Sequence, residues 1–301
     1  MAAIVSIASG KGGVGKSTTV SNLGLLLARR GLSVVLVDLD VGGADLHIMF
    51  GELAPKLSLS DFLARRVETL AETAIALAVN PKLRLIAGTG DTLRNTNPAS
   101  QTKRRLEKHV RELDADVILL DIGAGSNLHA LDFFLWADVP VVVSTPDPTS
   151  VMDLYRFVKL AAIRRVTTAI GGREQLSEQI ADLDVASIEQ LLASAGAAGP
   201  EIEARAKAAL TTFRPALIFN SSNDRDRTAG ARLAAVIQKF LGTPADVLGQ
   251  VPEDPAVARA VRKFLPVVER EPDAPAARAF AVVADALYER LKPFLPQNRR
   301  G

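Results

Sequence analysis

The sequence contains no cysteine among its 301 residues. This absence excludes structural disulfides, thiolate metal sites, cysteine-ligated iron–sulfur clusters and cysteine nucleophiles. Histidine is also scarce, and His47, His109 and His129 lie too far apart in the sequence to suggest a zinc site. A chain without cysteine is compatible with a cytoplasmic location, which we take as the expectation.

Long apolar runs are missing as well. Runs such as Val34–Val37 and Pro140–Val143 have the length of a strand, and none approaches the roughly 20 residues of a membrane-spanning helix. The residues Met1–Val5 lack a basic region and lead directly into a predicted strand, so we expect no secretory signal. The net charge of +2 does not by itself indicate a nucleic-acid partner.

Short β-branched runs alternate with longer amphipathic stretches along the chain. The pattern predicts strands at Ala3–Ala8, Ser33–Val37, Leu83–Ala87, Asp116–Leu120, Pro140–Thr145, Pro215–Asn220, Asp246–Val251 and Pro266–Val268. It predicts helices at Ser17–Arg30, Gln101–Leu113, Leu128–Ala137, Ser150–Arg165, Thr228–Leu241 and Pro275–Leu291. Alternation of this kind indicates an α/β fold, with a mainly parallel twisted sheet covered by helices on both faces. No linker is evident, and we expect one domain over residues 1–301.

The interval between Lys159 and Asn220 is longer than a helix and its return to the sheet require. Helical periodicity continues through Glu174–Ile180, Val185–Ala193 and Glu201–Phe213, which predicts a helical insertion at about residues 166–213. Two interpretations stay open: the insertion adds surface helices only, or it is a docking site for a regulatory protein partner.

The strongest signal is the run Gly10-Lys11-Gly12-Gly13-Val14-Gly15-Lys16-Ser17-Thr18. It fits the phosphate-loop pattern G-x-x-x-x-G-K-[ST], and it lies between a predicted strand and a predicted helix. Backbone N–H groups and the start of the helix would hold the phosphates of a nucleotide. We expect Lys16 to reach the β- and γ-phosphates and Ser17 to bind Mg²⁺; the alternative is a glycine-rich turn without this function.

Lys11 is a second lysine within the loop, and an ordinary phosphate loop does not require it. It is either a solvated surface charge or a cation that lies beside the transferring phosphate oxygens of its own chain or of a partner chain.

Carboxylates follow two of the predicted strands. Asp121 ends the apolar run Val117–Leu120, and Asp38 and Asp40 end the run Val34–Val37. Residues two apart on an extended chain lie on the same side. One carboxylate of the pair can therefore order the water bound to magnesium, and the other can orient the attacking water. We expect Asp38 and Asp121 at the metal and Asp40 in catalysis; the alternative for Asp38 is a turn or helix cap.

Together these residues resemble the MinD/ParA superfamily of P-loop ATPases with a deviant Walker A motif. The resemblance rests on the strings KGGVGKST, DLDVGGADLHIMFG, VILLDIGAG, STPDPTSVMDLYRFVK and GQVPED, and it extends from Ala3 to about Leu291. Within the superfamily the chain is most similar to the FlhG (FleN)/MinD branch. The points for that branch are the segments at residues 40–44, 100–103, 121–125 and 146–150.

The resemblance implies a P-loop NTPase fold, ATP and Mg²⁺ as cofactors, and a homodimer that forms with ATP. It implies that Lys11 crosses to the partner's nucleotide, that Lys11, Lys16 and Asp40 are catalytic, and that Asp121 lies on the magnesium side. It also implies that Asn220 recognises adenine and that Pro252, Glu253 and Asp254 close over the base. From the residues alone, Asn220 is equally a common type of turn residue at a strand end.

The activity implied is slow, partner-stimulated ATP hydrolysis that controls the position or number of a cellular structure, such as a flagellum or a division site. The alternative is a ParA-type ATPase that binds DNA without sequence preference and partitions a chromosome, a plasmid or protein cargo. Nitrogenase-type reductases and iron–sulfur scaffold ATPases share the fold but need cysteines, and they are therefore excluded.

The C-terminal helix and short tail, at about residues 275–301, bear on the location. MinD-like proteins often end in a basic amphipathic helix that binds membrane. Here a partial apolar stripe is interrupted by Pro293 and Pro296, which favours a packed terminal helix over a membrane-surface helix. The stripe consists of Leu287, Tyr288, Leu291, Phe294 and Leu295. Peripheral attachment at a membrane or cell pole is the weaker alternative.

Overall fold

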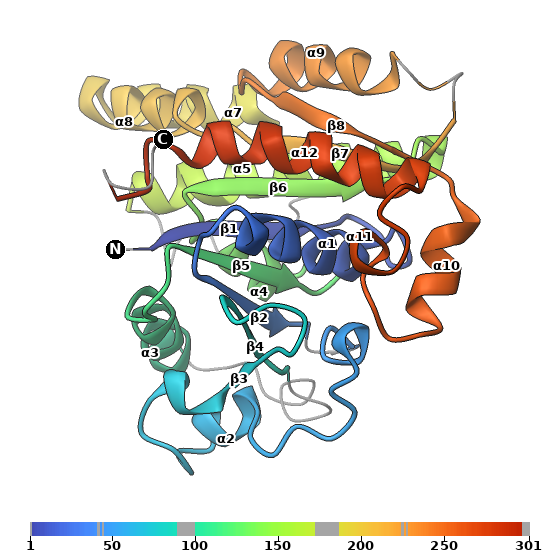
Figure 1. The fold of residues 1–301 in the computed structure, drawn as a ribbon. Helices are drawn as coiled ribbons and strands as arrows, with labels where there is room; N and C mark the ends of the chain where they lie inside the picture. The colour runs from blue at the N-terminus through green and yellow to red at the C-terminus, as the bar shows by residue number, and fades with distance from the viewer. Residues whose placement is uncertain are drawn as a thin grey trace.

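A single mixed sheet runs through the centre of the molecule in the computed structural model, which describes residues 2–40, 43, 45–88, 100–171, 187–223, 226 and 228–296. Within these residues the strands follow the order β3-β4-β2-β5-β1-β6-β7-β8 (Figure 1). Their bounds are β1 Ala3–Ala8, β2 Val34–Leu39, β3 Ala74–Ala76, β4 Leu83–Ile86, β5 Val117–Ile122, β6 Val139–Ser144, β7 Ala216–Ser222 and β8 Asp246–Pro252. The short β3 pairs antiparallel with β4, and all the other pairings are parallel.

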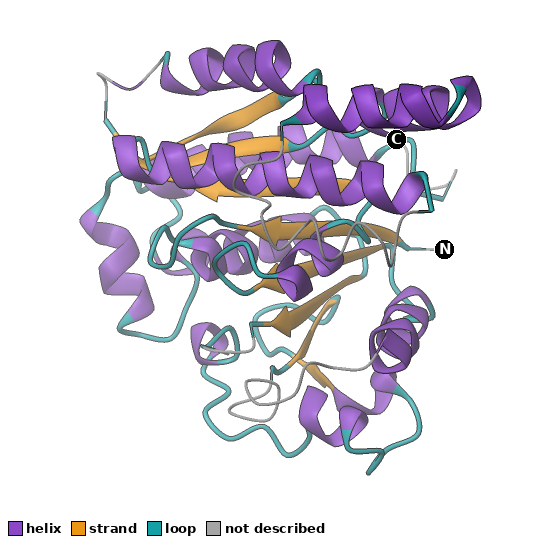
Figure 2. Ribbon diagram, turned by 180° about the vertical axis from the view of Figure 1, so that it is seen from behind, coloured by secondary structure: helices purple, strands orange, loops and turns teal. Residues whose placement is uncertain are grey.

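Helices cover both faces of this sheet (Figure 2). They are α1 Lys16–Arg29, α2 Leu59–Leu63, α3 Ser100–Arg111, α4 Leu128–Phe134, α5 Pro148–Ala169, α7 Ile188–Ala198, α8 Pro200–Thr211, α9 Ala229–Leu241, α10 Pro255–Val261, α11 Val267–Arg270 and α12 Pro275–Leu291. Two 3₁₀ turns, η1 Ile48–Phe50 and η2 Leu70–Thr73, lie between β2 and β3. The α/β class predicted from the sequence is confirmed.

Strand β1 shows why the sheet has a helix layer on each side. All six of its residues are buried; Ile4 and Ala8 face one apolar cluster, and Ala3, Val5 and Ile7 face the other. The first cluster takes side chains from α3, α4, α5 and α9, and the second takes them from α1, α11 and α12. A parallel strand buried on both faces needs an almost continuous apolar sequence, which is the pattern seen here.

The region predicted as a helical insertion contains α7 and α8, which pack on each other and on α5. The predicted helix at Glu174–Ile180 lies outside the described residues. At the other end of the chain, Leu287, Leu291 and Leu295 are at most 1% exposed and belong to the core. The three leucines of the tail's apolar stripe are therefore packed inside the protein, whereas Tyr288 is half-buried and Phe294 is 43% exposed. None of the helices in the described ranges combines the length and apolar character needed to cross a membrane.

One predicted element is wrong. Residues Pro266–Val268, predicted as a strand, are the cap and first turn of helix α11. Val267 and Val268 are buried against the second apolar cluster, and a short apolar run can achieve this burial as either a strand or a helical turn. Strands β2 and β5 also extend beyond the predicted ends at Val37 and Leu120, so that Asp38 and Asp121 lie within them.

Candidate nucleotide-binding site

The loop between β1 and α1 lies at the carboxyl ends of the parallel strands. Gly13 and Gly15 have φ angles of 80° and 84°, a left-handed conformation that strains other residues. Gly15 directly precedes α1, whose first residue is Lys16. Ser17 and Thr18 follow in its first turn, where backbone N–H groups have no intrahelical acceptor. The local geometry is therefore suited to hold an anion.

Gly10, predicted to contact the nucleotide, has a packing role in the fold. A Cβ atom at this position would lie 2.3 Å from the carbonyl oxygen of Asp153 in α5. Only glycine permits so close an approach between the loop and this helix. At the neighbouring Gly12, by contrast, a Cβ would meet only the Ala124 methyl, at 4.0 Å.

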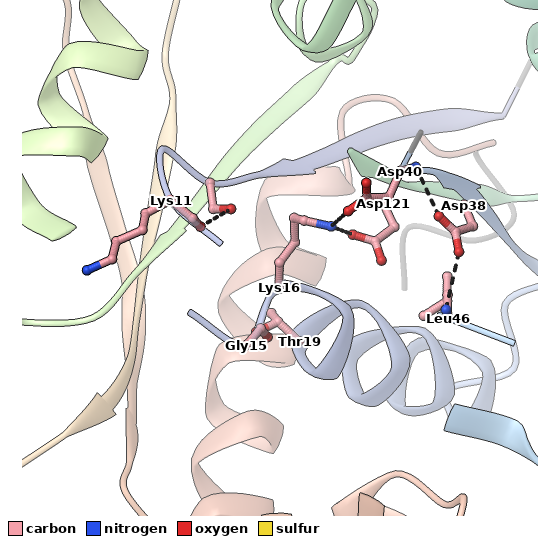
Figure 3. A network of polar contacts seen from close by, with 9 residues as sticks. Lys11, Gly15, Lys16, Thr19, Asp38, Asp40, Leu46 and Asp121 are labelled. Atoms are coloured by element: carbon pink, nitrogen blue, oxygen red, sulfur yellow. Dashed lines mark hydrogen bonds and ion pairs between the residues drawn. The ribbon is translucent and has the colours of Figure 1, made fainter. Parts of the chain in front are cut away.

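Lys16 lies among carboxylates (Figure 3). Its Nζ forms an ion pair with Asp121 Oδ1 and lies 3.5 Å from Asp40 Oδ2. Burial by itself would lower the pKa of Lys16, but Asp121, Asp40 and Asp38 outweigh it, and the pKa is raised. The lysine is thus held in its charged form.

Asp38 and Asp121 are register partners on the adjacent strands β2 and β5. Asp38 accepts hydrogen bonds from the backbone N–H groups of Asp40, at 3.0 Å, and Leu46, at 3.2 Å. Burial and the neighbouring Asp121 raise the pKa of Asp38 to about 8. Burial also raises the pKa of Asp121, against the opposing effects of Lys16 and the nearby Ser17 hydroxyl.

These groups fit a magnesium ion. Asp121 Oδ2 is a buried oxygen that accepts no hydrogen bond from the described residues. Lys16 contributes one positive charge against the carboxylates of Asp38, Asp40 and Asp121. Mg²⁺ prefers oxygen ligands and is commonly held by one or two carboxylates together with substrate phosphates. Asp121, Asp38 and the Ser17 hydroxyl are residues of this type, and their assignment as ligands stays a prediction.

Lys11 does not take part in this cluster. Its side chain points away from Lys16 (Figure 3), is exposed, and donates to Thr149 Oγ1 at 3.4 Å. Its backbone carbonyl accepts a hydrogen bond from Ser9 Oγ at 2.9 Å. The loop is therefore fixed at this point while the amine faces solvent.

A cavity of about 750 Å³ lies at the ends of β7 and β8. Its walls are Ser222, Asn223, Gln250, Pro252, Glu253, Asp254, Pro255 and Ala258. The structure thus places Pro252, Glu253 and Asp254 together in a cavity wall. The Asp254 carboxylate accepts from the N–H groups of Ala256 and Ala276, which hold its pKa below the usual value.

Asn220 is not among the cavity residues. Its Nδ2 donates to the carbonyl of Val14 in the phosphate loop, at 2.9 Å. Ser222, Asn223 and Gln250 were missed in the sequence, although they adjoin the predicted strand ends at Asn220 and Val251. Their position beside Pro252–Asp254 is the signal that could have found them.

A phosphate loop that faces carboxylates on neighbouring parallel strands defines a P-loop nucleotide-binding protein. Residues 5–267 match the CobQ/CobB/MinD/ParA nucleotide binding domain, and the chain belongs to this family. The antiactivator FleN of Pseudomonas aeruginosa is 26% identical over 99% of this chain and 89% of its own. The septum site-determining protein MinD of Helicobacter pylori is 31% identical over 64% of this chain and 74% of its own.

The fold also matches solved structures. MinD of Pyrococcus horikoshii, solved with Mg-ADP, superposes with a TM-score of 0.62 at 22% identity and covers 95% of this chain and 96% of its own. The resemblance to the MinD/ParA ATPases inferred from the sequence is confirmed. ATP and Mg²⁺, predicted as cofactors, agree with membership of this nucleotide-binding family.

Proposed function

We propose that the protein is a Mg-ATP-dependent ATPase switch that dimerises around ATP and regulates the position or number of a cellular structure, such as a flagellum or a division site. The observation that carries this proposal is the orientation of Lys11. A lysine in the phosphate loop is exposed and turned away from the loop's own Lys16. A lysine amine in this orientation is better placed to contact the nucleotide of a second chain than the nucleotide of its own chain.

Within one chain, Lys16 can pair with two kinds of anion, the carboxylates of the site and the phosphates of a bound nucleotide. It contacts Asp121 and Asp40 as described, and its position at the start of α1 places it beside the anion-binding loop. When bound, Mg²⁺ would supply the divalent charge that stabilises phosphate oxygens. We assign Lys16 to the phosphates, Asp121 and Ser17 to the metal, and Asp40 to orienting the attacking water.

Helix α5 links Lys11 to the predicted insertion. Thr149, which accepts the hydrogen bond from Lys11, lies in its first turn, and the 22-residue helix is about 33 Å long. Near its other end Arg165 donates to the Ala209 carbonyl of α8 at 3.0 Å. The names of the relatives, an antiactivator and a septum site-determining protein, support a regulatory output. We therefore propose that a regulatory partner binds the α7–α8 pair and that ATP binding at the phosphate loop controls this contact through α5.

DNA partition, the alternative, would need basic side chains available on one surface. Several arginines of α3 and α5 instead bind within the protein. Arg105 donates to the Phe62 carbonyl and Arg164 pairs with Asp132. These two arginines are therefore engaged within the protein, whereas Arg104, Arg232 and Lys239 are exposed, and DNA binding stays the second candidate.

The test is light scattering after size exclusion, with and without Mg-ATP. The wild type should shift from monomer to dimer, and Asp40→Ala should accumulate more dimer because it binds ATP but hydrolyses it slowly. Lys11→Ala should stay monomeric with an ATP Kd within about twofold of wild type. Lys239→Ala removes an exposed lysine from α9 and should behave as wild type. A wild type that stays monomeric with ATP would refute the switch.

A further inference from the structure

We propose that Asp132 is a positioning residue that holds helix α4, and with it the loop between β5 and α4, in place beside the nucleotide site. The inference rests on the proposed function and adds a residue to the support of that site. Both carboxylate oxygens of Asp132 accept hydrogen bonds: Lys103 of α3 donates to Oδ2 at 2.7 Å, and Arg164 of α5 donates to Oδ1 at 2.9 Å. One carboxylate thus joins three helices that pack on the same face of the sheet.

The charges at this junction are largely withdrawn from water. The exposed fractions of the side chains are 18% for Lys103, 18% for Asp132 and 25% for Arg164. His129, one turn earlier on α4, adds no charge at neutral pH, because burial and Lys103 lower its pKa against the opposing effect of Asp132. Asp132 therefore separates two cations that repel each other, and its removal would leave both without compensation.

Apolar packing alone does not fix the place of α4. The helix has seven residues, and a helix this short takes its position from tertiary contacts. The Phe134 carbonyl at its end accepts a hydrogen bond from Ser6 Oγ of β1 at 2.9 Å, which holds that end on the sheet. Burial of apolar side chains is non-directional, so the ion pairs to α3 and α5 set where the helix lies between them.

The loop at residues 123–127 leads from β5 directly into α4 and contacts the nucleotide site. The N–H of Gly125 donates to the Ser9 carbonyl, just before the phosphate loop, at 3.0 Å. A Cβ atom at Gly123 would lie 3.0 Å from Asp40 Oδ1, so the loop backbone packs against this carboxylate. A shift of α4 would therefore disturb the residue that we assign to orienting the attacking water.

This role predicts slower turnover without weaker nucleotide binding, because the phosphates are assigned to Lys16 and the loop amides and not to α4. Asp132→Asn should lower kcat about tenfold and leave the ATP Kd within about twofold of wild type. Asp246→Asn is the matched control: Asp246 also lies between two arginines, Arg214 and Arg290, but at the amino end of β8. It should keep the wild-type kcat. Urea denaturation would establish that both variants are folded under the assay conditions.

A double-mutant cycle tests whether Asp132 acts through its bridge to α5. If it does, Asp132→Asn combined with Arg164→Gln should lower kcat by about the same tenfold as Asp132→Asn alone. Losses that multiply would show that the two residues act independently, which would contradict the bridge.

A readout without turnover separates this inference from the proposed function. In the nucleotide-free protein, NMR should show faster hydrogen exchange of the Gly125 amide in Asp132→Asn than in wild type or Asp246→Asn, with β2 amides unchanged. Wild-type exchange at Gly125, or a wild-type kcat, in Asp132→Asn would overturn the positioning role. A wild type that does not hydrolyse ATP, together with faster Gly125 exchange in the variant, would refute the proposed function and leave the positioning role standing.

Discussion

Lys16 and Asp121 form a buried ion pair between the phosphate loop and strand β5, with side-chain exposures of 7% and 1%. Both residues were predicted to bind parts of Mg-ATP, and here they bind each other. Breaking a buried pair by removing one partner leaves an uncompensated charge. The pair therefore couples the nucleotide site to the stability of the fold.

Lys16→Ala should abolish ATP binding, because it removes the point charge beside the loop amides. It should also leave Asp121 and Asp38 without their cation, at a cost of about 3 kcal/mol in unfolding free energy at pH 8. Calorimetry and urea denaturation measure the two effects. Lys239→Ala is the control for loss of a lysine. Unchanged ATP affinity would exclude Lys16 from the site.

The raised pKa of Asp38 predicts how stability depends on pH. Its folded pKa is about 8 and its reference value is 3.8. The folded state therefore holds a proton that the unfolded state releases, and stability should fall as the pH rises from about 4 to about 8. Asp38→Asn removes this titration and should flatten the profile. Urea denaturation in EDTA at several pH values across this range provides the measurement, and parallel profiles for both proteins would contradict it.

Asn22 joins the phosphate-loop helix to α11. Its Nδ2 donates to the Thr18 carbonyl at 2.7 Å, and its Oδ1 accepts from the Val268 N–H at 3.0 Å. Because Asn22 is fully buried, Asn22→Ala should leave the Val268 N–H without an acceptor and lower the unfolding free energy by about 2 kcal/mol. Asn127→Ala, which removes the exposed cap of α4, should cost about 1 kcal/mol. If both variants lose the same small amount of unfolding free energy in urea denaturation, the hydrogen bonds of Asn22 do not stabilise the contact between α1 and α11.

Much of the fold and of the site could be predicted because short, continuous stretches of the sequence specify them. The phosphate loop is one continuous run, and the apolar runs before Asp38 and Asp121 mark strands whose carboxyl ends share one edge of the sheet. The helix Pro275–Leu291 was predicted with its observed bounds.

What could not be predicted depends on tertiary contacts. The partner of Lys16 lies 105 positions away, and the Val14 carbonyl that Asn220 contacts lies 206 positions away. The turn at Val267–Val268 is decided by packing on the second apolar cluster, since three residues carry no usable periodicity.

The central claim is that Lys11 acts on the nucleotide of a second chain. Its most direct test mixes Lys11→Ala with Asp40→Ala and measures ATP hydrolysis. Each variant alone should hydrolyse ATP far more slowly than the wild type. In a mixed dimer, the chain that retains Asp40 receives Lys11 from its partner, so one site is complete and activity should return. If Lys11 serves its own chain, no site in the mixture has both residues. Activity that stays at the level of the separate variants, in a mixture shown by co-purification of differently tagged chains to contain mixed dimers, would contradict the account.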